Sequence, residues 1–87
     1  MTPQQCEQLR LSLLRYLDLN PARWGLSASL LCQFVRNEGS PASADDVERE
    51  LDYLKDKGLV IALGKLISPE LLAWKISASG RDYLASR

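Results

Sequence analysis

Apolar residues recur every three or four positions in three stretches of the chain, the spacing of an amphipathic helix. Each stretch begins and ends with residues that favour helix termini. The predicted N-caps are Thr2, Ser27 and Ser43, of which Thr2 and Ser43 open capping boxes with Gln5 and Asp46. The predicted ends are Asn20-Pro21, Gly39 and Gly58. The pattern therefore predicts three helices separated by short turns.

Each predicted helix has one apolar face that should point into a core. The faces consist of Cys6, Leu9, Leu13, Tyr16 and Leu17 in the first helix, Leu30, Leu31, Phe34 and Val35 in the second, and Val47, Leu51 and Leu54 in the third. Leu11 lies about 200° around the first helix from Leu9. Leu11 is thus either a single exposed leucine or a contact to a second copy of the chain.

After Gly58 the periodicity changes from helical to alternating. The segments "LVIAL" and "LLAWKIS" are typical of two strands, joined by "GKLISPE". Leu72, Trp74 and Ile76 alternate with Ala73 and Lys75, which predicts one buried face. Residues 24–26, "WGL", favour a short extended piece, and Trp24 and Trp74 are expected to pack near the junction of the hairpin and the helices. Ser77 is expected to cap a last short helix that docks through Tyr83 and Leu84.

Length and composition fit one globular domain spanning residues 1–87. Of the 87 residues, 46% are hydrophobic and 25% charged, a mixture that can form a core. No apolar run reaches the roughly 20 residues of a membrane helix, and the N-terminus lacks the layout of an export signal. We therefore expect a cytoplasmic protein.

The inventory of reactive side chains is short. The chain has no histidine, which removes the commonest general base and metal ligand, and it has no glycine-rich phosphate loop. Cys6 and Cys32 lie in helical apolar patterns and are interpreted as buried free thiols. We expect neither catalysis nor a bound metal or cofactor.

Two stretches resemble a known fold family. The segment "VERELDYLKDKGLV" is similar to the end of a recognition helix that runs into a β-hairpin, and "WKISASGRDYL" is similar to the segment after the hairpin in bacterial winged-helix repressors. In the latter, Trp74, Ser77, Gly80 and Arg81 occupy the matching places. The run "ISPELLAWKISASGRDYLA" also resembles small winged-helix proteins of Mu-like phages and prophages.

The resemblance covers nearly the whole chain. It implies an α+β winged helix, with a three-helix helix-turn-helix core, a two-stranded β-hairpin wing and a C-terminal helix. It also implies double-stranded DNA binding and transcriptional regulation, usually as a homodimer. Because one fold serves many functions, the functional part of this inference needs support from the site itself.

Charge works against DNA binding by the third helix. The chain has 11 basic and 11 acidic residues, but residues 45–58 contain six carboxylates and three cations. We predict that Arg49 reads bases, unless it pairs with Asp45 or Asp52 along the helix. The other candidate DNA contacts are Ser43, Tyr53, Lys65, Lys75, Arg36 and Ser40.

The alternative function is a protein-interaction module that presents its acidic helix, or the surfaces around Leu11 and Tyr53, to another protein. For each candidate lysine taken alone, the composition of protein surfaces favours a solvated surface charge over a DNA contact. If the protein is a homodimer, Leu11 and Tyr83 are the residues that we expect at its interface.

Overall fold

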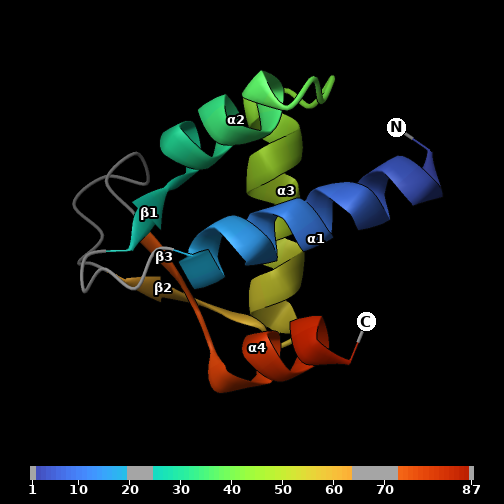
Figure 1. Cartoon of the computed structure of the whole chain (residues 1–87). Coiled ribbons are helices and arrows are strands. Elements are labelled where there is room, and N and C mark those ends of the chain that lie inside the picture. Colours follow the sequence, from blue (N-terminus) through green and yellow to red (C-terminus); the bar gives the residue numbers. More distant parts are fainter. Residues whose placement is uncertain (1, 20–24, 64–72, 87) are drawn as a thin grey trace.

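The computed structural model describes residues 2–19, 25–63 and 73–86, which form four helices and a small antiparallel sheet (Figure 1). In chain order the elements are α1 (Pro3–Leu19), β1 (Leu26–Ser27), α2 (Ala28–Asn37), α3 (Ala44–Asp56), β2 (Val60–Leu63), β3 (Ala73–Ile76) and α4 (Ala78–Ala85). The predicted α+β class and the order of helices and strands are confirmed.

The helices begin at the predicted caps. In α1 the backbone N–H of Gln5 donates to Thr2 Oγ1 at 3.2 Å, and the backbone N–H of Thr2 donates to the side-chain Oε1 of Gln5 at 2.9 Å. Ser43 and Asp46 make the same reciprocal pair at the start of α3. Ser27 Oγ accepts from the Leu30 N–H at the start of α2. These side chains satisfy backbone donors that have no partner within the helix.

Two glycines end helices in the left-handed backbone region. Gly39 has φ 95° and Gly58 has φ 76°, values that side chains disfavour. After Gly58, the Leu59 N–H returns to the Leu54 carbonyl oxygen at 2.9 Å, the bond that closes a Schellman motif. The chain therefore leaves α3 sharply and enters β2 at once.

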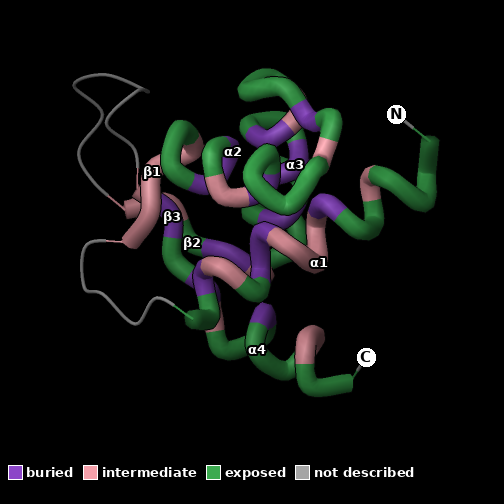
Figure 2. Tube along the Cα trace, turned by 45° about the horizontal axis from the view of Figure 1, so that its top comes forward, coloured by how far each residue is buried: buried purple, intermediate pink, exposed green. Residues whose placement is uncertain are grey.

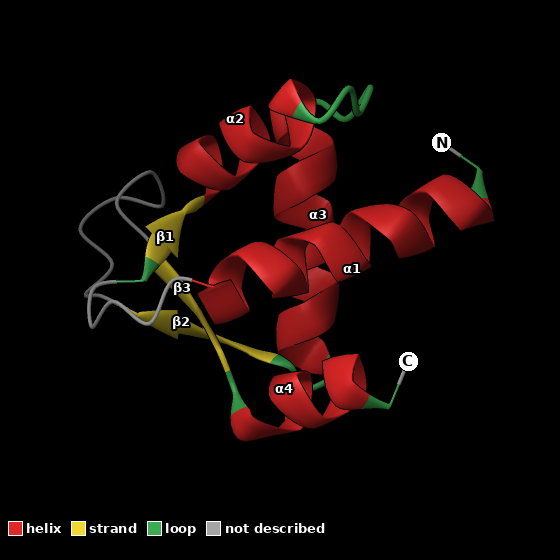
Figure 3. Cartoon of the chain, viewed as in Figure 1, coloured by secondary structure: helices red, strands yellow, loops and turns green. Residues whose placement is uncertain are grey.

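The two strands predicted after Gly58 are present as the antiparallel pair β2 and β3, and β1 adds a third strand, so that the sheet has the order β1-β3-β2 (Figure 3). β1 pairs with β3, with Leu26 opposite Trp74, and β2 pairs with the other edge of β3. Two residues are too few to give an alternating pattern, which is why the sequence indicated only an extended piece. Gly25 lets β1 approach β3, because a Cβ there would lie 2.5 Å from the Trp74 carbonyl oxygen.

Figure 2 shows the buried positions where the helices and the sheet meet. The predicted face of α1 is buried at Leu9, Leu13 and Leu17, and Leu14 is buried as well. Because α1 contacts α2, α3, α4 and β3, its buried stripe is wider than one helical face. Leu11 is half-buried.

Two residues predicted on the buried face of α1 are only half-buried, Cys6 and Tyr16. The Tyr16 hydroxyl donates to the Glu38 carboxylate at the surface, and this bond raises the pKa of the phenol. Cys6 and the buried Cys32 are both free thiols.

In α2 the predicted stripe is shifted. Leu31 and Val35 are buried as expected, but Leu30 is 43% exposed and Phe34 is half-buried. Cys32 is buried instead. The Phe34 ring lies against the Tyr16 ring, with centroids 5.2 Å apart, so it covers the junction of α1 and α2 from outside.

In α3 the predicted face is confirmed, since Val47, Leu51 and Leu54 are fully buried. In the central strand β3, Trp74 and Ile76 are buried.

On the opposite face of β3, Lys75 is exposed, as the alternation predicts. It pairs across the sheet with the exposed Ile61 of β2. Trp24 and Leu72 lie outside the described residues.

Hydrogen bonds of Ser77 link the start of α4 to the residues that follow α3. Its Oγ accepts from the Gly80 N–H at 3.1 Å and donates to the Gly58 carbonyl oxygen at 2.6 Å. Its N–H also donates to the Leu59 carbonyl oxygen at 3.0 Å. Gly80 is buried, and Tyr83 and Leu84 pack against the core as predicted.

Candidate functional site

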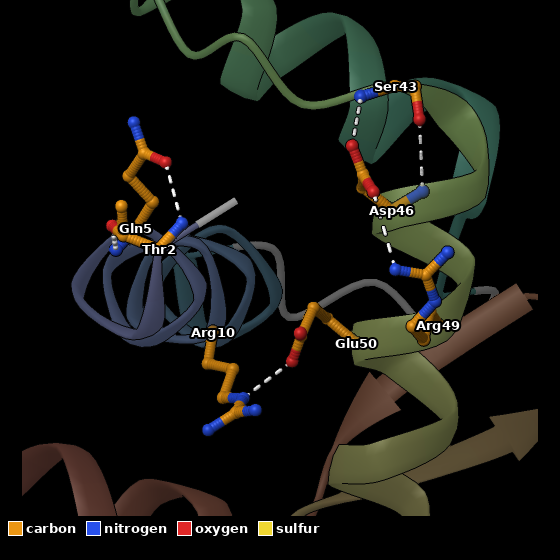
Figure 4. A network of polar contacts seen from close by, with 7 residues as sticks. All are labelled: Thr2, Gln5, Arg10, Ser43, Asp46, Arg49 and Glu50. Carbon is orange, nitrogen blue, oxygen red and sulfur yellow. Dashed lines mark hydrogen bonds and ion pairs between the residues drawn. The ribbon is translucent and has the colours of Figure 1, made fainter.

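The outward face of α3 carries Asp45, Arg49, Asp52 and Asp56, all exposed. Arg49 is the most prominent cation there, with a side chain that is 73% exposed. Its Nη1 lies 3.6 Å from Asp46 Oδ1. The predicted partners were Asp45 and Asp52, so the prediction of an ion pair along the helix holds but the predicted partners are wrong. Asp46 is held by its other oxygen, Oδ2, which accepts from the Ser43 N–H, and Oδ1 then faces Arg49 (Figure 4).

The capping box also fixes the charge of Asp46. Hydrogen bonds from Ser43 lower the pKa of the Asp46 carboxyl below its ordinary value, and the charge of Arg49 contributes in the same direction. A carboxyl whose pKa is lower in the folded state stabilises the fold above its unfolded pKa, and this stabilisation is lost as the pH falls through the folded pKa.

We therefore expect the melting temperature of Asp46→Asn to be lower than wild type at pH 6, with a difference that shrinks as the pH falls below about 4. Thermal unfolding followed by circular dichroism from pH 6 to acid measures it. Asp45→Asn, in the same helical turn but outside the capping box, is the control and should keep most of the wild-type pH dependence. A constant difference between Asp46→Asn and wild type across this range would contradict the assignment.

A second carboxylate of α3 points into the molecule. Glu50 is only 6% exposed and forms a hydrogen-bonded ion pair with the Nε of Arg10 on α1 (Figure 4). This bond raises the pKa of the Arg10 guanidinium. The Arg10 Cζ also lies 4.0 Å from the centroid of the Tyr53 ring, a cation–π contact.

Sequence reasoning missed the Arg10–Glu50 pair, although one signal was present. Glu50 stands between Val47 and Leu54 at the three- and four-residue spacing of the buried stripe. A carboxylate at such a position needs a buried partner. Of the six carboxylates of α3, Asp46 and Glu50 thus form hydrogen bonds within the domain. The exposed surface of α3 therefore carries fewer carboxylates than the sequence of the helix contains.

Two of the remaining candidates near the start of α3, Ser40 and Ser43, form hydrogen bonds within the domain. Ser43 Oγ accepts from the Asp46 N–H, and Ser40 Oγ accepts from the Ala42 N–H at 3.2 Å. Arg36 is exposed near the end of α2. The structure thus brings Arg36, Ser40 and Ser43 into the segment that leads from α2 into α3.

The other candidates lie beyond the middle of α3. Tyr53 is 40% exposed, with Arg10 and Lys57 over its ring. Lys75 lies on β3, in the sheet that follows α3, and Lys65 is outside the described residues. The candidate cations that the structure describes, Arg36, Arg49 and Lys75, are therefore distributed over α2, α3 and the sheet.

The two residues predicted at a dimer interface are both half-buried. Leu11 lies beside Gln8, Ser12 and Arg15 in a shallow hollow on α1. Tyr83 packs against the core of its own chain. The homodimer stays a prediction.

Among residues 2–19, 25–63 and 73–86, no three acidic or cysteine side chains gather closely enough to hold a metal ion. No helix in the same residues is both long and apolar enough to cross a membrane.

Comparison of the chain with family models, curated proteins and solved structures finds no match. The interpretation of the site therefore depends on its own geometry.

Proposed function

We propose that the chain is a winged-helix domain that binds double-stranded DNA as a transcriptional regulator, with α3 in the major groove. The observation that carries this proposal is the topology. In chain order α1-β1-α2-α3-β2-β3, β1 pairs with β3 and β3 with β2, and the antiparallel pair β2-β3 follows α3 directly, as the wing of a winged helix does. The step from this fold to DNA is an analogy, and the side chains of α3 and the sheet have to support it.

Arg49 is the proposed base-reading residue. It projects from the outward face of α3, and a guanidinium can donate two hydrogen bonds to a guanine edge. Its contact with Asp46 is a surface ion pair, worth at most about 1 kcal/mol, so Arg49 can exchange this partner for a base.

The proposed phosphate contacts are Lys75 and Lys65 in the wing and Arg36 before α3, with Ser40, Ser43 and Tyr53 as further polar contacts. Few phosphates can be neutralised by this set, whereas the carboxylates of Asp45, Asp52 and Asp56 repel DNA. Binding without sequence preference should therefore be weak, with a shallow dependence on salt.

Titration of a labelled random duplex and of duplexes with single-base changes in a selected site tests the proposal at low and moderate salt. Lys65→Ala and Lys75→Ala should each weaken binding to all duplexes and lower the salt slope by about one. Arg49→Ala should instead relax the preference at one base position. Asp52→Lys should strengthen binding to the random duplex because it removes a repulsive charge.

A protein partner is the second candidate, favoured by the exposed carboxylates Asp45, Glu48, Asp52 and Asp56 on α3. If wild type fails to bind DNA even at low salt while Asp52→Lys binds, the acidic face is a barrier to DNA. The protein-interaction function then replaces the DNA-binding one.

A further inference from the structure

A cavity of about 300 Å³ lies where α1, the end of α3 and α4 meet. Its lining consists of Arg10, Tyr53, Leu54, Lys57, Leu59 and Tyr83. The volume is at the lower end of the range for small-molecule sites, which is about 300–1,000 Å³. The cavity is thus large enough for one ring and a short substituent.

The lining combines two cations with aromatic and aliphatic surface. Arg10 Cζ lies 4.0 Å and Lys57 Nζ 5.6 Å from the centroid of the Tyr53 ring. The half-buried Leu59 and Tyr83 add apolar surface, and the fully buried Leu54 lies beneath them. Such a mixture suits a ligand with a flat apolar body and a negative end.

Glu50 limits how much negative charge the cavity can accept. Its bond to Arg10 uses Nε, so the two Nη atoms are not the donors in this ion pair (Figure 4). Arg10 can therefore still donate hydrogen bonds while its charge is balanced by Glu50. Lys57 then leaves the site with a net charge of about +1, which favours a monoanion over a phosphate dianion.

We propose that this cavity binds a small aromatic carboxylate. The ring would lie against Tyr53, Tyr83 and Leu59, and the carboxylate would accept hydrogen bonds from Lys57 and from the Nη atoms of Arg10. This inference does not depend on DNA binding, because Tyr53 is the one described lining residue that is shared with the proposed DNA contacts.

The test uses phenylacetate and its neutral analogue phenylacetamide as probes, titrated into the whole ¹⁵N-labelled chain and followed by amide NMR shifts. Phenylacetate should give saturable shifts around Lys57, Leu59 and Tyr83, with a dissociation constant of about 1–10 mM for a ligand of this size. Phenylacetamide should bind about fivefold more weakly, because it lacks the charge. Absence of saturable shifts at these residues, or equal binding of the two probes, would overturn the proposal.

Variants separate the proposed contact from general electrostatics. Lys57→Met should weaken phenylacetate binding about fivefold and change phenylacetamide binding by less than about twofold. Lys55→Met is the matched control, since Lys55 is an exposed lysine at the end of α3 that does not line the cavity, and it should leave both affinities unchanged. Equal effects of the two substitutions would show an unspecific charge effect and overturn the proposal. Thermal unfolding verifies that both variants remain folded.

Discussion

Gly80→Ala is expected to destabilise the domain by about 3 kcal/mol, at the upper end of the usual cost of overpacking. An added Cβ would lie 2.2 Å from the Leu59 carbonyl oxygen and 2.7 Å from Ile76 Cγ1. The first of these atoms is backbone and cannot rotate away. The same oxygen accepts the hydrogen bond from the Ser77 N–H, so moving Leu59 also disturbs the junction of α3 and α4. Urea unfolding followed by circular dichroism measures the loss.

Two control variants isolate the steric cause. Ser79→Ala changes the exposed position next to Gly80 in α4 and should stay within about 0.5 kcal/mol of wild type. Gly58→Ala places its Cβ in open space but at φ 76°, which should cost about 1–2 kcal/mol. We expect Gly80→Ala to be less stable than Gly58→Ala. If Gly80→Ala is equally stable or more stable, the close approach of α4 to Leu59 is contradicted.

The motif that contains Ser77 and Gly80 was recognisable in the sequence, but the contacts that require these residues are seen only in the structure. The spacing of Ser77 and Gly80 indicated a similarity to winged-helix repressors, and Ser77 was recognised as a helix cap. The structure adds the contacts with Gly58 and Leu59, which join two segments about 20 residues apart. Such contacts depend on the tertiary arrangement and leave no periodic signal.

The helices were predictable because their termini are encoded locally. Each of these signals acts on backbone groups only a few residues away along the chain. They are the capping boxes that begin at Thr2 and Ser43 and the terminating glycines Gly39 and Gly58. Features formed by distant segments were not predictable in the same way. β1 is too short for a pattern, and the exposed Leu30 depends on how α2 packs against its neighbours.

The candidate site divides along the same line. The exposed position of Arg49 on α3 follows from helical geometry, but its choice of Asp46 as partner depends on how the capping box orients one carboxylate. The Arg10–Glu50 pair joins residues 40 positions apart, and only the packing of α1 against α3 brings them together.

Arg10→Met is expected to destabilise the domain by about 2–3 kcal/mol, because it leaves the buried Glu50 carboxylate without its counter-ion. Breaking a fully buried pair costs about 3–5 kcal/mol, but the Arg10 side chain is 29% exposed, so water reduces the cost here. Methionine keeps most of the aliphatic volume of arginine, which limits the packing loss. Arg15→Met, at an exposed position of α1, is the matched control and should cost less than about 0.5 kcal/mol.

The double variant Arg10→Met, Glu50→Met tests whether the cost comes from the unpaired carboxylate rather than from the loss of arginine. Replacing both partners with apolar side chains of similar length removes the buried charge, so the double variant should be more stable than Arg10→Met alone. Urea unfolding of wild type, the two single variants and the double variant completes the cycle, in which we expect an interaction energy of about 1–3 kcal/mol. If the two single effects simply add, Arg10 and Glu50 do not stabilise each other, and the packing of α1 on α3 depends on the surrounding leucines alone.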